Sequence, residues 1–313
     1  MTSSSADTPH IPLIVMTADL STVSGLSVPH AIAFGRRFGS TIEVLHAAPP
    51  AAGSTGSFSV LAAPDKDKWL TNSLRPLLAP LQAYGVETKP VLLRGDVDDV
   101  LREAASTASL VITTKHGGGD SHGRVGSKSI NLARTATAPI LVVPGTVPEG
   151  GLNPEPPYYE TIAVTTDFSE ESLAGVRHAV RLARAFRAAL LIINVVQARG
   201  LKATIDGTNV TWPDLPEGSE ARIDDARYKM AEQIEIPEDV AVEQRVVMCD
   251  DVATGITGAC VEGKADLLVI PSHGMGRIAT MLLGSATESV LQRSKIPVLV
   301  LRRQWLQRGD AWK

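Results

Sequence analysis

Glycines late in the chain have a spacing that suits phosphate binding. Gly274 follows the apolar run 267–270, and nine residues separate it from the pair Gly284-Ser285. Glycine lets backbone approach a ligand closely, and a helix that starts at this pair offers unpaired N–H groups to an anion. The pattern is neither a Walker A motif, which needs Gly-Lys-Ser/Thr, nor a Rossmann G-x-G-x-x-G after a first strand. It predicts phosphate binding in outline.

The same residues also have a purely structural explanation. Ser285 and Glu288 have the spacing of a capping box, in which the serine caps the helix and the glutamate reaches back to the cap amide. Because glycine patterns are frequent outside binding sites, the spacing leaves both explanations open.

The chain repeats itself in three blocks that occur in the same order. The first match pairs Asp19 with Asp167, the second pairs His116 with His273, and the third pairs Gly126-Ser127 with Gly284-Ser285. Matches of this kind indicate a duplicated domain. The blocks are residues 12–21 with 161–169, 109–117 with 266–274, and 126–144 with 284–302.

A Pro/Gly-rich stretch marks the boundary between the copies. Residues 147–159 are predicted to form a semi-extended linker, because proline and glycine disfavour regular structure there. The first domain is then expected over 1–146 and the second over 160–305, both of ordinary domain size.

Short apolar runs alternate with amphipathic stretches in each copy. The run 161–166 precedes a helical stripe at Leu173, Val176, Val180 and Ala183. Continuously apolar strands that alternate with helices are typical of a doubly wound parallel sheet. Ligands of such sheets bind beyond the carboxyl ends of the strands, so we expect the Asp167 turn and residues 271–274 to face one another.

Composition narrows the classes of partner and compartment. The formal net charge of −4 gives no general basic field, so nucleic acid is disfavoured as a partner. Two cysteines without a C-x-x-C spacing fit a reducing compartment. No signal peptide or bilayer-spanning run is evident, so no membrane partner is expected and the predicted location is the cytoplasm.

Together these residues resemble the universal stress proteins, whose nucleotide-binding members carry G-x2-G-x9-G-(S/T) and an Asp after the first strand. The resemblance covers nearly the whole chain as two tandem copies. It implies two Rossmann-like, adenine-nucleotide alpha hydrolase-like domains, each with a five-stranded parallel sheet. It also implies that the last strands, 139–144 and 297–302, pair as an intramolecular pseudo-dimer, and that two chains can associate further as a homodimer.

The resemblance further implies an ATP or AMP site in the second domain. Thr165, Thr166 and Asp167 would lie near the ribose and adenine, and Val195 would present backbone to the adenine. The loop and phosphate positions would be Pro271, His273, Gly274, Gly284, Ser285 and Ala286. Mg²⁺ could accompany the nucleotide, with Asp167 as its nearest carboxylate.

Both copies depart from the family pattern. Pro271 replaces the first glycine of the second copy, which removes an N–H and adds bulk. The first copy has Thr114 at that position. Only eight residues, 118–125, separate its Gly117 from Gly126-Ser127. Its weaker candidate site would comprise Asp19, Gly117, Gly126 and Ser127, with Arg124 and Lys128 as possible cations.

Other residue patterns favour structural roles. Acids at 96–99 and 250–251 each precede a helix, where capping is the simplest explanation. Histidines 116 and 122 are a weak metal signal. The insert 197–224 with Trp212 is either a lid over the site or a surface loop held by one aromatic side chain.

Two functions of different class follow. The first is a nucleotide-binding stress-response regulator that works mainly through its second domain. The alternative is a nucleotide-free scaffold of the same fold that presents surfaces to unidentified protein partners. Enzymatic turnover is undecided and at most slow ATP hydrolysis, since no catalytic residues stand out and His273 is the only imidazole expected near the site.

Overall fold

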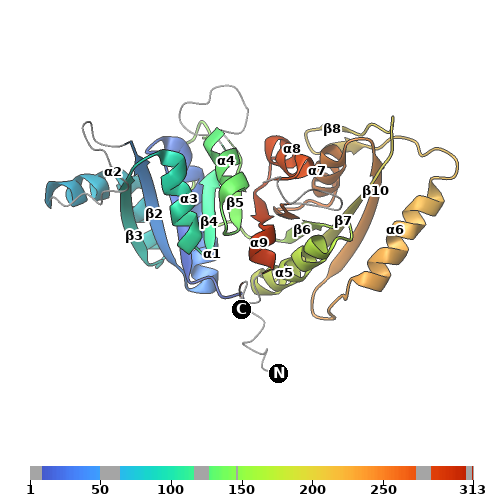
Figure 1. Cartoon of the computed structure of the whole chain (residues 1–313), viewed down its shortest axis with the longest axis horizontal. Helices are drawn as coiled ribbons and strands as arrows, with labels where there is room; N and C mark the ends of the chain where they lie inside the picture. The colour runs from blue at the N-terminus through green and yellow to red at the C-terminus, as the bar shows by residue number, and fades with distance from the viewer. Residues whose placement is uncertain are drawn as a thin grey trace. The chain divides into compact units, whose positions relative to one another are not determined.

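The computed structural model describes residues 9–49, 64–115, 127–145, 147–272, 283–307 and 312. The chain divides into two compact units (Figure 1). One unit contains His10–Tyr158 together with Trp312, and the other consists mainly of Tyr159–Ala311.

The first unit is a five-stranded parallel sheet with helical crossovers. Its strands are ordered β5-β4-β1-β2-β3, and every pair within it is parallel. Its elements are β1 (Leu13–Ala18), the 3₁₀ segment η2 (Thr22–Ser27), α1 (Val28–Phe38), β2 (Thr41–Ala48), α2 (Pro64–Ala83), β3 (Thr88–Arg94), α3 (Val97–Thr107), β4 (Leu110–Thr114), α4 (Ser127–Thr135) and β5 (Ile140–Val143).

The second unit repeats this arrangement. Its five strands are ordered β10-β7-β6-β11-β12 and are again all parallel. Its elements are β6 (Thr161–Thr165), α5 (Glu170–Phe186), β7 (Ala189–Gln197), a hairpin of β8 (Thr204–Asp206) and β9 (Asn209–Thr211), α6 (Glu220–Gln233), β10 (Val242–Cys249), α7 (Val252–Glu262), β11 (Leu267–Pro271), α8 (Ser285–Arg293), β12 (Val298–Leu301) and α9 (Arg303–Leu306).

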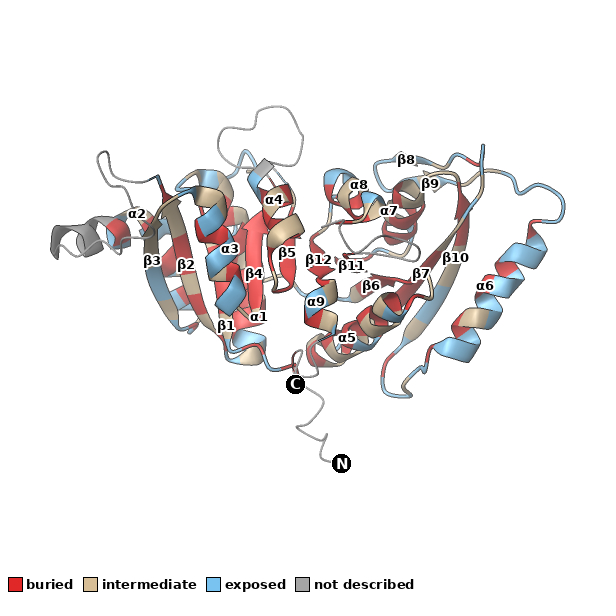
Figure 2. Cartoon of the chain, viewed as in Figure 1, coloured by how far each residue is buried: buried red, intermediate tan, exposed pale blue. Residues whose placement is uncertain are grey.

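The apolar runs form strands because both faces of each sheet are covered. Every residue of β4, β5, β11 and β12 is buried, whereas β3 and β10, at the opposite edge of each sheet, carry exposed residues (Figure 2). Burial on both faces removes the alternation that a half-exposed strand would show. The predicted fold class, two doubly wound parallel sheets in tandem, is confirmed.

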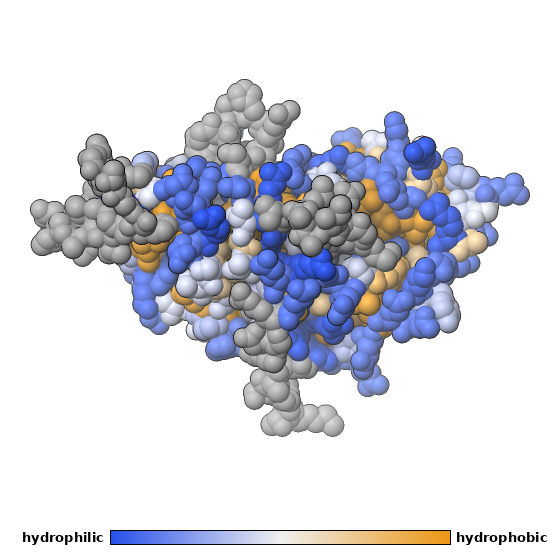
Figure 3. Space-filling view, viewed as in Figure 1, coloured by the Kyte–Doolittle hydropathy of each residue, from blue (hydrophilic) through white to orange (hydrophobic). Residues whose placement is uncertain are grey.

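The predicted pairing of the last strands concerns how the two units meet, and it stays a prediction. Within its own unit, each of β5 and β12 is an edge strand. On the face drawn in Figure 3, hydrophilic side chains cover most of the described surface, and apolar side chains reach it in separate patches. Among the described residues, no helix has both the length and the apolar character needed to cross a membrane.

A histidine also occurs at the same position in both copies. His30 in α1 and His178 in α5 are both 11 residues after the matched aspartates, Asp19 and Asp167. Burial lowers the pKa of each imidazole to about 4. For His178, the charges of Arg181 and Arg177 lower the pKa further. The folded protein therefore holds both histidines neutral at physiological pH.

We expect His178 to make the protein sensitive to mild acid. Its pKa is lower in the folded protein than in the unfolded chain, so the free energy of unfolding falls as the pH drops from about 6.5 toward 4. At about 1.4 kcal/mol per pKa unit, the loss between about pH 7.5 and about pH 5 should be roughly 2 kcal/mol. His178→Phe keeps an aromatic ring beside Trp305, whose centroid is 4.7 Å away, but does not titrate. Urea unfolding at both pH values should show a smaller loss in this variant.

The matched variant is His30→Phe in the first unit, which should reduce the loss in acid by a similar amount because burial lowers the pKa of His30 to about 4 as well. If His178→Phe loses as much stability in acid as the wild type, other groups cause the sensitivity.

Candidate functional site

The second unit has a crevice where its strand order reverses. β6 and β11 are neighbours in the sheet, but the crossover after β6 leads to β7 on the opposite side. Loops that leave such a pair in opposite directions expose a space at the carboxyl ends of the strands. The residues that follow β6 and the last residue of β11, Pro271, meet at this point.

A tight turn after β6, the Asp167 turn (residues 167–169), lies at one side of the crevice. Phe168 adopts a left-handed conformation with φ of 65°. The Asp167 Oδ1 atom accepts hydrogen bonds from the Ser169 backbone N–H at 3.1 Å and from its hydroxyl at 2.6 Å. The Ser169 hydroxyl in turn accepts from the Ser172 N–H and caps α5. The carboxylate thus fixes the turn and the start of the helix together.

Buried side chains form hydrogen bonds with the backbone of the Asp167 turn and of the residue before it. The Ser172 hydroxyl accepts from the Asp167 N–H at 3.3 Å and lies 3.1 Å from the Thr166 hydroxyl. The Asn194 side chain on β7 donates to the Thr166 carbonyl at 2.8 Å. Sequence analysis missed Ser172 and Asn194, although Ser172 has a counterpart three residues after Ser21 in the first copy.

The first unit contains the same turn. Asp19 Oδ1 accepts from the Ser21 N–H at 3.0 Å and from the hydroxyls of Ser21 and Ser24, each at 2.6 Å. Leu20 has φ of 64°, close to that of Phe168. The duplication therefore preserves backbone geometry and hydrogen bonds as well as sequence.

A cavity of about 110 Å³, the switch-point cavity, lies beside the Asp167 turn. It brings together six predicted site residues: Thr165, Thr166, Asp167, Val195, Pro271 and Ala286. The remaining lining residues, which sequence analysis did not single out, are Ser172, Ile193, Val252, Ile256, Ile270 and Thr287. The described walls enclose less than the roughly 300–1,000 Å³ of common small-molecule pockets.

The start of α8 forms another side of the crevice, and here one prediction is wrong. Gly284, not Ser285, is the N-cap residue, with extended φ and ψ of −69° and 145° and no side-chain cap. Its carbonyl accepts from the Glu288 N–H at 2.9 Å, and its own N–H donates to the Ser272 carbonyl at 2.8 Å. Ser285 is the first helical residue and is exposed, so its hydroxyl does not close a capping box.

One hydroxyl joins α8 to the end of β11. Thr287 donates to the Pro271 carbonyl at 3.1 Å, and in the first unit Ser129 donates to the Thr114 carbonyl at 2.6 Å. These four residues occupy matched positions in the two copies. Each unit therefore holds its loop-bounding helix against the strand by the same contact.

The glycine loops themselves lie outside the described residues. His273 and Gly274 of the second unit, and Gly117 and Gly126 of the first, belong to this group. Ser127 begins α4. Lys115, which directly follows β4 and which sequence analysis missed, is buried, and its burial lowers the pKa of its amine.

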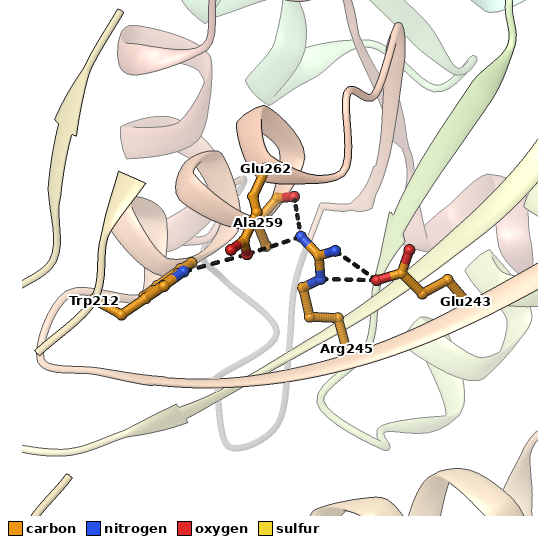
Figure 4. A network of polar contacts seen from close by, with 5 residues as sticks. All are labelled: Trp212, Glu243, Arg245, Ala259 and Glu262. Atoms are coloured by element: carbon orange, nitrogen blue, oxygen red, sulfur yellow. Dashed lines mark hydrogen bonds and ion pairs between the residues drawn. The ribbon is translucent and has the colours of Figure 1, made fainter. Parts of the chain in front are cut away.

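The insert 197–224 contains the β8–β9 hairpin, and Trp212 holds this part of the insert on α7. The Trp212 ring lies against α7, so that a Cβ atom on Gly258 would be only 3.0 Å from it. Its indole N–H donates to the Glu262 carboxylate at 3.2 Å, and Arg245 pairs with the same carboxylate at 3.0 Å (Figure 4). Among the described residues that line the switch-point cavity, none comes from the insert.

Acidic residues elsewhere have the capping roles that the sequence predicted. Asp96 accepts from the N–H groups of Asp98 and Asp99, and Asp251 accepts from that of Thr254. Within the described ranges, no three His, Cys, Asp or Glu side chains gather as metal ligands would. A Mg²⁺ ion at Asp167 would thus need ligand oxygens from a bound phosphate.

Known proteins resemble both halves of the chain. The universal stress protein family matches residues 12–144 and 158–302. A universal stress protein of Methanocaldococcus jannaschii is 29% identical over 46% of this chain and 83% of its own length. Another, of Mycobacterium tuberculosis, is 30% identical over 64% of each chain. A crystal structure of a universal stress protein from Archaeoglobus fulgidus covers 95% of this chain and 98% of its own, with 18% identity and a TM-score of 0.61, and shows the same fold.

We expect the Asp167 carboxylate to stabilise the second unit even without a ligand. Asp167→Ala removes the acceptor of two hydrogen bonds and should lower the free energy of unfolding by about 1–2 kcal/mol. Asp167→Asn retains an acceptor oxygen and should lose less. Urea unfolding of both variants measures the difference.

Asp19→Ala is the matched variant in the first unit and should show at least as large a loss, because Asp19 accepts a third hydrogen bond from the Ser24 hydroxyl. An Asp167→Ala protein as stable as the wild type would mean that the other contacts hold the turn unaided.

Proposed function

Because this chain belongs to the universal stress protein family, we propose that its second domain binds an adenine nucleotide, ATP or AMP, and that the protein acts as a stress-response regulator. The observation that carries the proposal is the meeting of three elements at one crevice. The Asp167 turn, the end of β11 and the N-terminal residues of α8 all line the switch-point cavity. Such a crevice is where open parallel sheets bind ligands.

The start of α8 suits a phosphate group. Its first N–H groups have no intrahelical acceptor, and the helix dipole makes this end favourable for negative charge. Gly284 has no side chain to obstruct the approach of a phosphate. Ala286, the second residue of α8, lines the cavity. In the proposal, Gly284, Ser285 and Ala286 hold the phosphates together with the glycine loop that contains His273 and Gly274.

The opposite side of the cavity suits the nucleoside. Thr165, Thr166 and Asp167 lie at the end of β6, and Val195 lies near the end of β7. The proposal places the ribose and adenine here, with backbone of Val195 facing the base. Mg²⁺, when present, would bind phosphate oxygens with Asp167 as a possible additional ligand.

A regulatory role follows if nucleotide changes the population of conformations. A ligand shifts an equilibrium between two packings only by its difference in affinity for them. Protein partners that bind one packing would then respond to nucleotide occupancy. The proposal includes a cytoplasmic location, which the two buried, unpaired cysteines favour.

One observation favours the alternative, a nucleotide-free scaffold. Pro271 lines the switch-point cavity at the position where the family pattern has glycine, and the cavity encloses only about 110 Å³. A site too narrow for nucleotide would leave the duplicated sheets to work through protein contacts. Binding measurements separate the two functions.

We expect ATP with Mg²⁺ to bind the wild-type protein in the micromolar range, which corresponds to about −8 kcal/mol. Gly284→Val should weaken this binding at least tenfold, or about 1.4 kcal/mol, because the added side chain occupies the approach to the start of α8. The φ of −69° at this position is compatible with valine, so the helix should remain. Isothermal titration calorimetry gives the affinity and the number of sites.

The matched control is Gly126→Val at the equivalent position of the first domain. It should leave most of the binding intact if the second domain provides the main site. A folded wild-type protein that binds neither ATP nor AMP at millimolar concentration would contradict the proposal and support the scaffold.

Restoring the family glycine should enlarge the site. Pro271→Gly removes the ring from the cavity wall and adds an N–H donor, so ATP affinity should increase several-fold. Calorimetry on this variant, with its melting temperature as a check on folding, tests the idea. If affinity is unchanged, the proline ring does not limit binding.

A further inference from the structure

The second unit contains a much larger cavity away from the switch point. This cavity, of about 1140 Å³ and here called the hairpin cavity, lies between the β8–β9 hairpin, α7 and the turns that precede β11 and β12. The described residues that line it and those that line the switch-point cavity have no member in common. The two turns, around Lys264 and Lys295, lie at the amino ends of the strands, whereas the Asp167 turn lies at the carboxyl ends.

A network of polar contacts holds the hairpin in place as one wall. Trp212 follows β9 and is hydrogen-bonded to Glu262 near the end of α7. Arg245 pairs with Glu262 and with Glu243, and also donates to the Ala259 carbonyl at 3.2 Å (Figure 4). The hairpin is therefore fixed to α7 through Trp212 and Glu262, and the cavity beside it is part of the folded domain.

The lining combines apolar side chains with positive charge. Val210, Val261 and Ile296 contribute apolar surface, and Lys264, Arg293 and Lys295 contribute cations. Among the described lining residues, Glu262 is the only acid and is already paired with Arg245. Arg293 is paired with Asp251 at 2.8 Å. Among the described residues, neither Lys264 nor Lys295 forms an ion pair, so two cationic charges are uncompensated.

The two lysines distinguish the second copy from the first. In the matched segment 126–144, Thr137 corresponds to Lys295. Lys264 lies in the turn 263–266 between α7 and β11, and the first copy has a shorter turn, 108–109, between α3 and β4. Lys264 also has a φ of 49°, a conformation that costs a residue other than glycine about 1 kcal/mol. The conformation ends α7, since the Lys264 N–H donates to the Val261 carbonyl at 3.1 Å and the Ala265 N–H donates to the Cys260 carbonyl at 2.9 Å.

We propose that the hairpin cavity binds a small amphipathic organic anion. The apolar body of such a ligand packs between the hairpin and α7, and its anionic group lies at the cavity mouth between Lys264 and Lys295. Mostly apolar walls with a few polar groups that fix orientation are typical of small-molecule sites. The two uncompensated cations select an anion over a neutral or cationic ligand.

Fluorescence titration with 1-anilinonaphthalene-8-sulfonate tests the site, because this dye combines apolar rings with a sulfonate. We expect saturable binding of one dye per chain, and displacement by dodecanoate. The double variant Lys264→Asn with Lys295→Thr removes both charges and keeps a residue that tolerates positive φ. It should weaken dye binding at least tenfold, while binding of the neutral dye N-phenyl-1-naphthylamine changes less than twofold.

Two further variants define the location. Thr257→Trp should narrow the cavity beside α7 and weaken binding of both dyes, since Thr257 lines it. Lys202→Thr, a change at an exposed lysine outside the lining, is the matched control and should leave both affinities unchanged. Thermal melting of every variant establishes that it is folded.

The proposal is overturned if the anionic dye binds the double variant as tightly as the wild type, or if Thr257→Trp has no effect. It is also overturned if Gly284→Val, which alters the switch point, is the change that abolishes dye binding. None of these outcomes depends on whether the protein binds ATP.

Discussion

The reversal of strand order in each parallel sheet determines where this protein can present functional groups. Backbone hydrogen bonds between β6 and β11 place the ends of two strands side by side, while their crossovers lead to opposite edges. The space between the two loops that leave these strands follows from the backbone topology alone. The site residues therefore come from segments that are far apart in sequence, and the geometry of the turns decides what faces the space.

The turns show what the duplication preserved and what it changed. Asp19 and Asp167 make the same pair of hydrogen bonds to the serine two residues later, and both turns contain a left-handed residue. Because these contacts stabilise the turn itself, they constrain the aspartate even in a domain that binds nothing. The residue after the fourth strand, in contrast, is the buried Lys115 in one copy and the buried Ser272 in the other. The two copies therefore share the aspartate turn but differ in the residue that follows the fourth strand.

The sequence predicted the strands and helices well because their burial leaves a direct pattern. The run 267–270 is apolar throughout because β11 is buried on both faces. In the predicted stripe of α5, Val176 and Ala183 are buried, whereas Leu173 and Val180 lie at the margin of the buried side. The helix start at Ser285 was harder, since a capping serine and a first-turn serine are one residue apart and differ only in backbone conformation. The β8–β9 hairpin was missed, although its two-residue loop, Gly207-Thr208, begins with a glycine between the β-branched Ile205 and Val210. Its position on α7 depends on Gly258 and Glu262, which no local pattern connects to Trp212.

Helix α7 is a wall of both cavities in the second unit, and close packing fixes its position. Val252 and Ile256 line the switch-point cavity, and Thr254, Thr257 and Val261 line the hairpin cavity. A Cβ atom on Gly255 would be only 2.8 Å from Val195, and one on Gly258 would be 3.0 Å from Trp212. The helix therefore contacts β7 on one side and the hairpin on the other at distances that only glycine permits. A ligand that displaces α7 from either side must disturb packing on the other, and by linkage the resulting change in affinity is the same in both directions. The close packing at these two glycines thus ties the position of α7 to β7 and to the hairpin at the same time.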